Sequence, residues 1–294
     1  MKPFLFLFQI SSIYFGQTPP TTESKVFAPG IVSIDSISEF GSTFSNDLTE
    51  FYFGVERKNG KAETHYMEFY QNKWTTPEPL LVHDVYSFND PMLSHDQKRL
   101  YFISDMPLSG EGPKKDFDIW YIERTKDGWT KPINAGPSIN SDKNEYYVSF
   151  TSNGKMYFSS GRNATEERPK DFDVYSSTRT KDGFLPAEKL GPAINSDDYE
   201  GDVFIAHDES YIIVAKQDLD ATSVNGGDLF IAFRTLNKKD WTPLVNMGDK
   251  VNGPRFDYCP FVTPDGKFLL YTRAGDIRWV DASIIKSLNK SITK

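Results

Sequence analysis

Cysteine and histidine are scarce in this chain, and this bounds its chemistry. Cys259 is the one cysteine among 294 residues, so no disulfide can form within the chain. A lone cysteine inside a strand is most often a packing residue, and Cys259 is interpreted as one. His65 and His83 have no histidine or cysteine neighbour at metal-ligand spacing, and His95 and His207 fall in predicted turns. We therefore expect no metal and no cofactor.

Positive charge and catalytic motifs are also lacking. The 33 lysines and arginines are outnumbered by 41 aspartates and glutamates, and the net charge is −8. This balance argues against nucleic acid and anionic lipid surfaces as partners and favours cationic ones. The sequence has no Gly-x-Ser-x-Gly elbow, no phosphate-binding Gly-x-x-x-x-Gly-Lys and no Gly-x-Gly-x-x-Gly. Nothing in it therefore indicates a nucleophilic hydrolase or a nucleotide-binding enzyme.

Long apolar runs are confined to the N-terminus. Lys2 precedes a mostly apolar stretch, Phe4–Phe15, which is too short to span a bilayer. This pattern predicts a signal peptide over residues 1–16 and a periplasmic or secreted protein; the alternative is a buried N-terminal strand. Residues 17–25 are rich in Pro and small polar residues and are interpreted as a linker. No later segment is apolar enough to form a membrane span.

The chain does contain a unit of about 50–57 residues that recurs five times. Each copy has an inner-strand pattern, a tight turn and an aromatic strand. The inner-strand patterns are Glu39–Phe44, Phe88–Leu93, Glu145–Phe150, Glu200–Ile205 and Asp257–Val262. Five copies at this period predict an all-β protein, a β-propeller with five four-stranded blades. Six blades are the alternative.

The outer strands of the repeat indicate how the ring closes. The third strand of four repeats begins with an aspartate, namely Asp118, Asp173, Asp228 and Asp276. An aspartate needed in each blade is interpreted as structural, accepting backbone N–H bonds. The last repeat lacks a fourth strand, whereas Ala28–Ser33 resembles the fourth-strand endings of the other repeats. We therefore expect the N-terminal segment to complete the last blade. This gives a propeller over residues 26–283 and a tail over 284–294.

The repeat resembles the TolB-like, WD-like propeller repeat of bacterial envelope proteins. The resemblance lies in Val262–Lys267, in Phe117–Tyr121 and in the Gly-Pro-x-Ile-Asn-Ser segments that end at Ser141 and Ser196. It covers nearly the whole chain after the predicted signal peptide. The resemblance implies a module that binds proteins or peptides at the channel mouth, without an assigned reaction; TolB itself has six blades.

Two features predict where a ligand binds. Three long loops, Ser104–Lys115, Ser160–Lys170 and Lys216–Gly227, connect second to third strands and share one face. The inner-strand starts on that face carry carboxylates and tyrosines. The candidate binding residues are Glu39, Asp90, Glu145, Tyr146, Tyr199, Glu200, Asp257 and Tyr258.

Three interpretations of this acidic set remain open. In the first, the acidic set is a solvated rim. In the second, it is a mouth that binds a basic peptide, a cation or a sugar stacked on tyrosine. In the third, it contains the carboxylate pair of a glycoside hydrolase. The absence of a catalytic motif favours a non-catalytic binding module, monomeric, with a protein, peptide or glycan ligand. The alternative is a carbohydrate-active enzyme that uses channel carboxylates.

Overall fold

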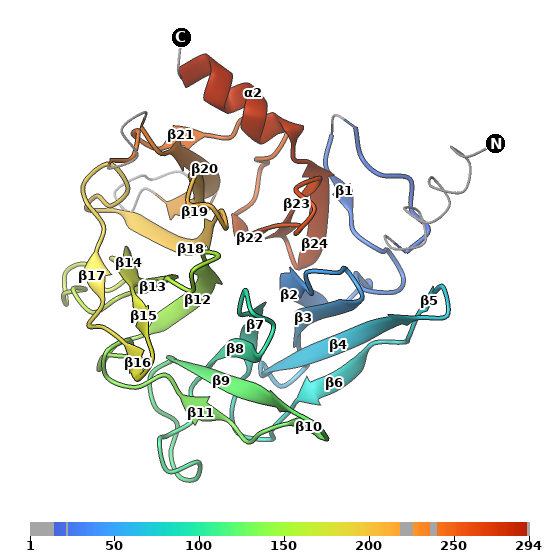
Figure 1. Cartoon of the computed structure of the whole chain (residues 1–294), viewed down its shortest axis with the longest axis vertical. Coiled ribbons are helices and arrows are strands. Elements are labelled where there is room, and N and C mark those ends of the chain that lie inside the picture. The colour runs from blue at the N-terminus through green and yellow to red at the C-terminus, as the bar shows by residue number, and fades with distance from the viewer. Residues whose placement is uncertain (1–14, 22, 218–225, 236–239, 293–294) are drawn as a thin grey trace.

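The computed structural model describes residues 15–21, 23–217, 226–235 and 240–292. Their regular structure is almost entirely β-strand, arranged as five blades around a central axis (Figure 1). The all-β, five-bladed propeller predicted from the repeat is confirmed. Each predicted inner-strand pattern coincides with the innermost strand of a blade.

The blades are antiparallel sheets whose strands run outward from the axis in chain order. The inner strands are β2 (Ser38–Phe44), β7 (Asn89–Leu93), β12 (Glu145–Phe150), β18 (Tyr199–Ile205) and β22 (Asp257–Val262). The second strands are β3 (Glu50–Glu56), β8 (Arg99–Ser104), β13 (Met156–Ser160), β19 (Tyr211–Gln217) and β23 (Phe268–Arg273). The third strands are β4 (Ala62–Tyr70), β9 (Asp118–Thr125), β14 (Asp173–Ser177), β20 (Asp228–Phe233) and β24 (Asp276–Asp281).

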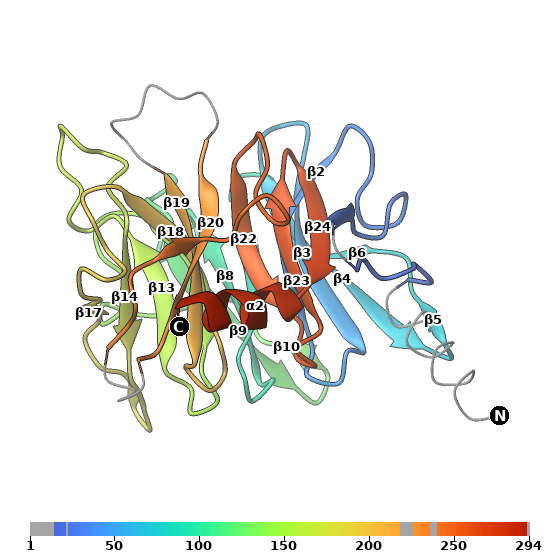
Figure 2. The same ribbon diagram turned by 90° about the horizontal axis from the view of Figure 1, so that it is seen from above.

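The outer strands are short, with two to four residues each. They are β5 (Lys73–Trp74) with β6 (Glu78–Leu81), β10 (Gly128–Trp129) with β11 (Ile133–Asn134), β17 (Glu188–Lys189), β21 (Val245–Asn246) and β1 (Lys25–Val26). A small hairpin, β15 (Arg179–Thr180) with β16 (Gly183–Phe184), stands beside the third blade. Figure 2 shows the blades edge-on, with their strands running between two faces.

The N-terminal segment closes the ring, as predicted, but through different residues. β1 pairs with β24, with Lys25 opposite Trp279 and Val26 opposite Arg278. Ala28–Ser33, which was expected to pair, instead forms the turn after the strand, as the Gly-Pro-x-Ile-Asn segments do after the other outer strands. The prediction placed the pairing residues a few positions too late in the chain, because the sequence motif marks the turn that follows the paired strand and not the strand itself.

Polar side chains that recur from repeat to repeat link the outer strands to the third strands through hydrogen bonds. The asparagine that ends the turn after an outer strand bonds both the N–H and the C=O of one third-strand residue; Asn140 does so with Ile119 at 2.9 and 3.0 Å. Asn195 and Asn252 repeat this on Val174 and Leu229. The strand-opening aspartates interact with side chains rather than with backbone N–H groups: Asp118 accepts a hydrogen bond from Asn134 and Asp228 one from Asn246, and Asp173 forms a salt bridge with Lys189.

The second strands are buried on both faces, because each lies between two neighbouring blades. Leu100, Tyr101, Phe102 and Ile103 of β8 are each 0% exposed. Such strands are expected to lack the alternation of polar and apolar residues that marks a half-exposed sheet. This explains the continuous apolar runs, and the large aromatic content fills the wedge-shaped space between blades.

After the last blade the chain ends in a helix, α2 (Ser283–Ile292), which lies against the edge of the propeller (Figure 1). Its N-terminal N–H at Ser283 donates to Asp281 Oδ1 at 2.7 Å, and Ile285 is 7% exposed. In the part of the chain that the structure describes, no helix has the length and apolar character needed to cross a membrane.

Candidate functional site at the channel mouth

Each inner strand has a β-bulge at the same place in the repeat. The strand register shifts there in all five blades, and the bulged residue has a positive φ. These residues are Gly41 (φ 48°), Asp90 (49°), Tyr147 (43°), Asp202 (45°) and Cys259 (52°). A bulge redirects a side chain that would otherwise follow the pleat. In this propeller it brings side chains from different blades together at the axis.

Three of the bulged residues form a buried polar cluster. Cys259 Sγ lies 3.4 Å from Asp90 Oδ1, and the Cys259 backbone N–H donates to Asp202 Oδ2 at 3.3 Å. Asp90 is 7% exposed, Asp202 6% and Cys259 2%. Among the described residues neither aspartate takes part in a salt bridge.

Burial and mutual repulsion disfavour the ionised forms of this cluster. Burial, and then the charge of Asp202, raise the pKa of Asp90. Burial also raises the pKa of Asp202, and it raises that of the Cys259 thiol well above its ordinary value. A cation placed between the two carboxylates would offset both effects. Within the described ranges no group of three or more His, Cys, Asp or Glu side chains is arranged to hold a metal ion.

The pair lies at the floor of a cavity of about 320 Å³ that opens at the channel mouth. The cavity is lined by Ser38, Phe40, Glu56, Gly60, Ala62, Ser87, Asn89, Asp90, Phe117, Asp202, Tyr258 and Cys259. This set contains three carboxylates and no basic side chain. Toward the opposite face the channel narrows to a space of about 20 Å³ between phenylalanines such as Phe44, Phe150 and Phe204, so the site is a blind pocket rather than a pore.

Aromatic rings form an arc around this mouth. Neighbouring ring centroids lie between 5.4 and 6.0 Å apart along the series Phe117, Tyr146, Phe172, Tyr199, Phe256 and Tyr258. Gly201 makes the arc continuous, because a Cβ there would lie 2.2 Å from the Tyr199 hydroxyl oxygen. Faces of aromatic rings attract cations and stack on planar or sugar ligands. Three predicted residues, Tyr146, Tyr199 and Tyr258, thus lie together beside the acidic pair.

The predicted carboxylates do not all converge on the channel. Glu145, Glu200 and Asp257 are 0% exposed and are bound within their own blades. Each accepts the backbone N–H of the residue four positions earlier, at 3.0, 2.9 and 2.9 Å respectively. Each also accepts a side-chain donor from the opposite residue of the second strand: Ser160 for Glu145, Lys216 for Glu200 and Arg273 for Asp257. These three carboxylates hold the loop that enters each blade.

Glu39 and Asp90 have different surroundings from those three. Asp90 occupies the bulge position and faces the axis with Asp202. Glu39 accepts one bond, from the Ile34 N–H at 3.2 Å, and lines a separate cleft. The predicted acidic set therefore divides into three structural carboxylates, one channel carboxylate and one carboxylate in a second cavity.

Sequence reasoning missed Asp202 and Cys259 as parts of the site. The signal was present, since aligning the repeats places both in the same column as Asp90, Gly41 and Tyr147. The strand starts are the positions that a regular pleat would place nearest the axis, and a bulge, which changes this, leaves no mark in the residue pattern.

One prediction tests the close packing of the bulge ring. Gly41→Ala is expected to destabilise the protein by about 2–3 kcal/mol, because its Cβ would lie 2.8 Å from Asp90 Oδ1 at a positive φ. The matched control is Gly60→Ala, whose φ of 72° brings a Cβ within 4 Å of nothing and which should cost about 1 kcal/mol. Urea unfolding measures both, and equal losses would contradict tight packing at the axis.

No protein-family model and no curated protein matches the sequence. Among solved structures, TolB from Acinetobacter baumannii superposes with a TM-score of 0.52 at 9% identity, over 83% of this chain and 54% of that chain. The chain thus spans about half the length of that TolB. A protein of unknown function from Dyadobacter fermentans superposes with a TM-score of 0.53 at 15% identity, over 90% and 83% of the two chains.

A gluconolactonase from Xanthomonas campestris has a TM-score of 0.53 at 9% identity, over 90% of this chain and 94% of that chain. At these identities the likeness concerns the fold, which is a TolB-like β-propeller. Because the same fold is shared by TolB and by an enzyme, the function of this chain has to be argued from its own residues.

Proposed function

We propose that the protein is a non-catalytic binding module, monomeric and periplasmic or secreted, that takes a cationic side chain of a peptide or protein ligand at its channel mouth. One observation carries this proposal: two buried carboxylates, Asp90 and Asp202, share a blind cavity whose described lining includes no basic residue. Burying a carboxylate without a cation is costly, so the pocket is complementary to a positive group.

The aromatic arc supports the same ligand. A guanidinium is planar, stacks on aromatic rings and bonds carboxylates through several donors. Tyr258 and Phe117 line the cavity at either end of the arc, and Glu56 is exposed at its rim. An arginine side chain would pass between these rings and reach the aspartate pair. The net charge of −8 adds a general attraction for basic ligands.

The test compares ligands that differ in charge alone. Calorimetric titration with a short peptide whose one charged side chain is an arginine should show binding, and the same peptide with citrulline in its place should bind at least about tenfold more weakly. Asp202→Asn should reduce the arginine-peptide affinity by about 10- to 100-fold, whereas Asp127→Asn, a change at a side chain that is 80% exposed, should leave it unchanged. Equal binding of the two peptides would refute the proposal.

A second candidate function is glycoside hydrolysis, favoured by the raised pKa of both aspartates inside an aromatic-lined cavity. An acid that stays protonated near neutral pH can protonate a leaving group, and the rings can stack on a sugar. Reducing-end release from a glycan panel, lost in Asp90→Asn and Asp202→Asn, would establish this activity and overturn the binding-only proposal.

A further inference from the structure

The first blade breaks a pairing that the third, fourth and fifth blades share. In those blades the buried carboxylate at the start of the inner strand faces a donor on the second strand, with Ser160 Oγ at 2.7 Å from Glu145 and Arg273 Nε at 2.7 Å from Asp257. The second blade has Phe88 in the carboxylate position and needs no donor. The repeat therefore supplies a donor wherever it buries this carboxylate, with one exception.

The exception is Glu39, which is 1% exposed and lies opposite Val55. Its Oε1 accepts the Ile34 N–H, but its Oε2 is buried and has no hydrogen-bond partner in the described structure. A valine cannot donate, so a deficit of one donor is built into this blade. A buried carboxylate oxygen without a donor requires an explanation in a native structure, and a ligand that supplies the donor is one such explanation.

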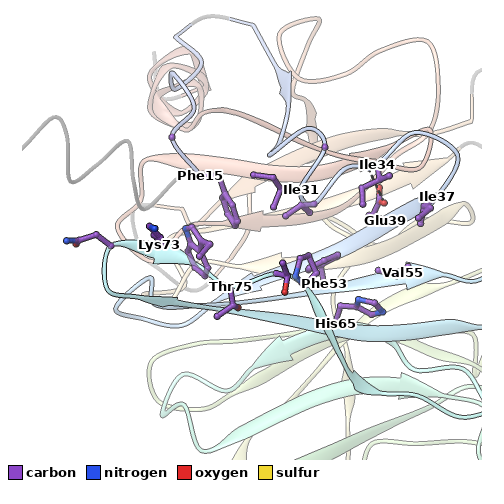
Figure 3. A pocket seen from close by; sticks show the side chains of 17 residues that line it. Phe15, Ile31, Ile34, Ile37, Glu39, Phe53, Val55, His65, Lys73 and Thr75 are labelled. Atoms are coloured by element: carbon purple, nitrogen blue, oxygen red, sulfur yellow. Dashed lines mark hydrogen bonds between the residues drawn. The ribbon is translucent and has the colours of Figure 1, made fainter.

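A large apolar cleft of about 790 Å³ occupies the place where the donor is lacking. Figure 3 shows Ile31, Ile34 and Ile37, on the segment that leads into β2, facing Phe53 and Val55 on β3 across the cleft. Trp74 closes one side of the cleft; Phe15, whose ring stacks on Trp74 at 4.7 Å, belongs to the predicted signal peptide, and the site does not depend on it. The three isoleucines are between 39% and 42% exposed, which is unusual for such side chains in one patch.

We propose that this cleft is a second ligand site, separate from the channel mouth, which binds a small molecule with an apolar body and a protonated primary amine directed at Glu39. The amine supplies the donor that Ser160, Lys216 and Arg273 supply in their blades. The apolar body covers the isoleucines and the face of β3. The volume of the cleft suits a ligand of drug-like size, and the contact between the ligand's amine and Glu39 would fix the orientation of the ligand.

The electrostatics of Glu39 agree with this ligand. Burial raises the pKa of Glu39 to about 7, and the nearby charge of Asp276 adds to the rise. An ammonium group is the partner that would favour the ionised carboxylate. His65 also lines the cleft, but its Nε2 is 2.8 Å from Glu63 Oε2, so it is engaged within β4.

The experiment uses the full chain and two probes of similar shape. 2-Phenylethylamine and 2-phenylethanol are titrated by calorimetry into the wild type, Glu39→Gln, Val55→Lys and the control Glu78→Gln, which changes an exposed residue on β6 next to the cleft. The wild type and Glu78→Gln should bind the amine at least about tenfold more tightly than the alcohol. Glu39→Gln should lose this preference while still binding the alcohol.

Val55→Lys imitates the Lys216–Glu200 pair of the fourth blade and should abolish amine binding by supplying the donor internally. If this variant does not fold, Glu39→Gln alone decides. Amine binding that is unchanged in Glu39→Gln, equal affinity for amine and alcohol, or no binding at millimolar amine would each overturn the proposal. Because Asp90 and Asp202 are untouched, arginine-peptide binding at the channel mouth should be the same in all four proteins.

Discussion

A chain that begins at Ile34 is expected to lose most of its stability. It would lack β1 and the buried residues that follow it: Phe27 is 0% exposed, and Ala28 and Val32 are each 1% exposed. The Phe27 ring contacts those of Phe44, Phe51 and Trp279. Truncation of a buried phenylalanine alone costs about 3–5 kcal/mol, and whole domains are stable by about 5–15 kcal/mol. Urea unfolding followed by circular dichroism measures the loss.

The matched control is a chain that begins at Gln17, which retains β1 and the turn after it. Gln17 itself is bound to the turn, accepting the Ala28 N–H at 2.8 Å through its side chain. This control loses the contacts of Phe15 with Trp74 and Phe27, so a smaller decrease of about 1–2 kcal/mol is expected. Equal stability of the two truncated chains would show that closure of the ring contributes little.

Arg273→Leu is expected to destabilise the protein by about 3–5 kcal/mol, because it leaves a buried carboxylate without its cation. Arg273 Nε lies 2.7 Å from Asp257 Oδ1, and the aspartate side chain is 0% exposed. The same arginine donates to the Val251 carbonyl and lies 5.5 Å from the Tyr271 ring. Chemical denaturation of the variant gives the difference directly.

The double variant Asp257→Asn with Arg273→Leu separates charge from packing. It removes the uncompensated charge and should therefore recover about 1–2 kcal/mol relative to Arg273→Leu. A loss below about 1 kcal/mol in Arg273→Leu would mean that the pair behaves like an exposed salt bridge, contrary to its burial.

The fold was predictable because the repeat recurs five times and each copy repeats the same residue types in the same places. Tight turns with Asp and Gly and strand-opening aspartates such as Asp118 fixed the strand order. Ring closure was also predictable, but its register was not, because β1 has only two paired residues, Lys25 and Val26, which form no recognisable pattern. Their pairing depends on β24, at the other end of the chain.

The acidic and aromatic character of the site was predictable from the sequence, whereas the exact residues that form it were less so. Acidic residues and tyrosines near the inner-strand starts do gather at the mouth, as Asp90 and Tyr258 show. The direction of each side chain depends on the bulge, which is a property of strand pairing rather than of local sequence. Glu145 and Asp202 are both acidic and near the same strand end, yet one holds a loop and the other faces the axis.

The closing strand has a consequence for the order in which this molecule is made. Lys25 and Trp279, which pair, are 254 residues apart in the chain. The first strand to be synthesised, β1, therefore cannot pair until the last strand, β24, has been made. Until then the fifth blade lacks its outer strand and exposes a sheet edge to other chains. Contacts of such long range form slowly. The interval before closure is therefore the stage at which we expect this protein to depend most on chaperones, and a chain exported before its C-terminal strands have been synthesised would close only after crossing.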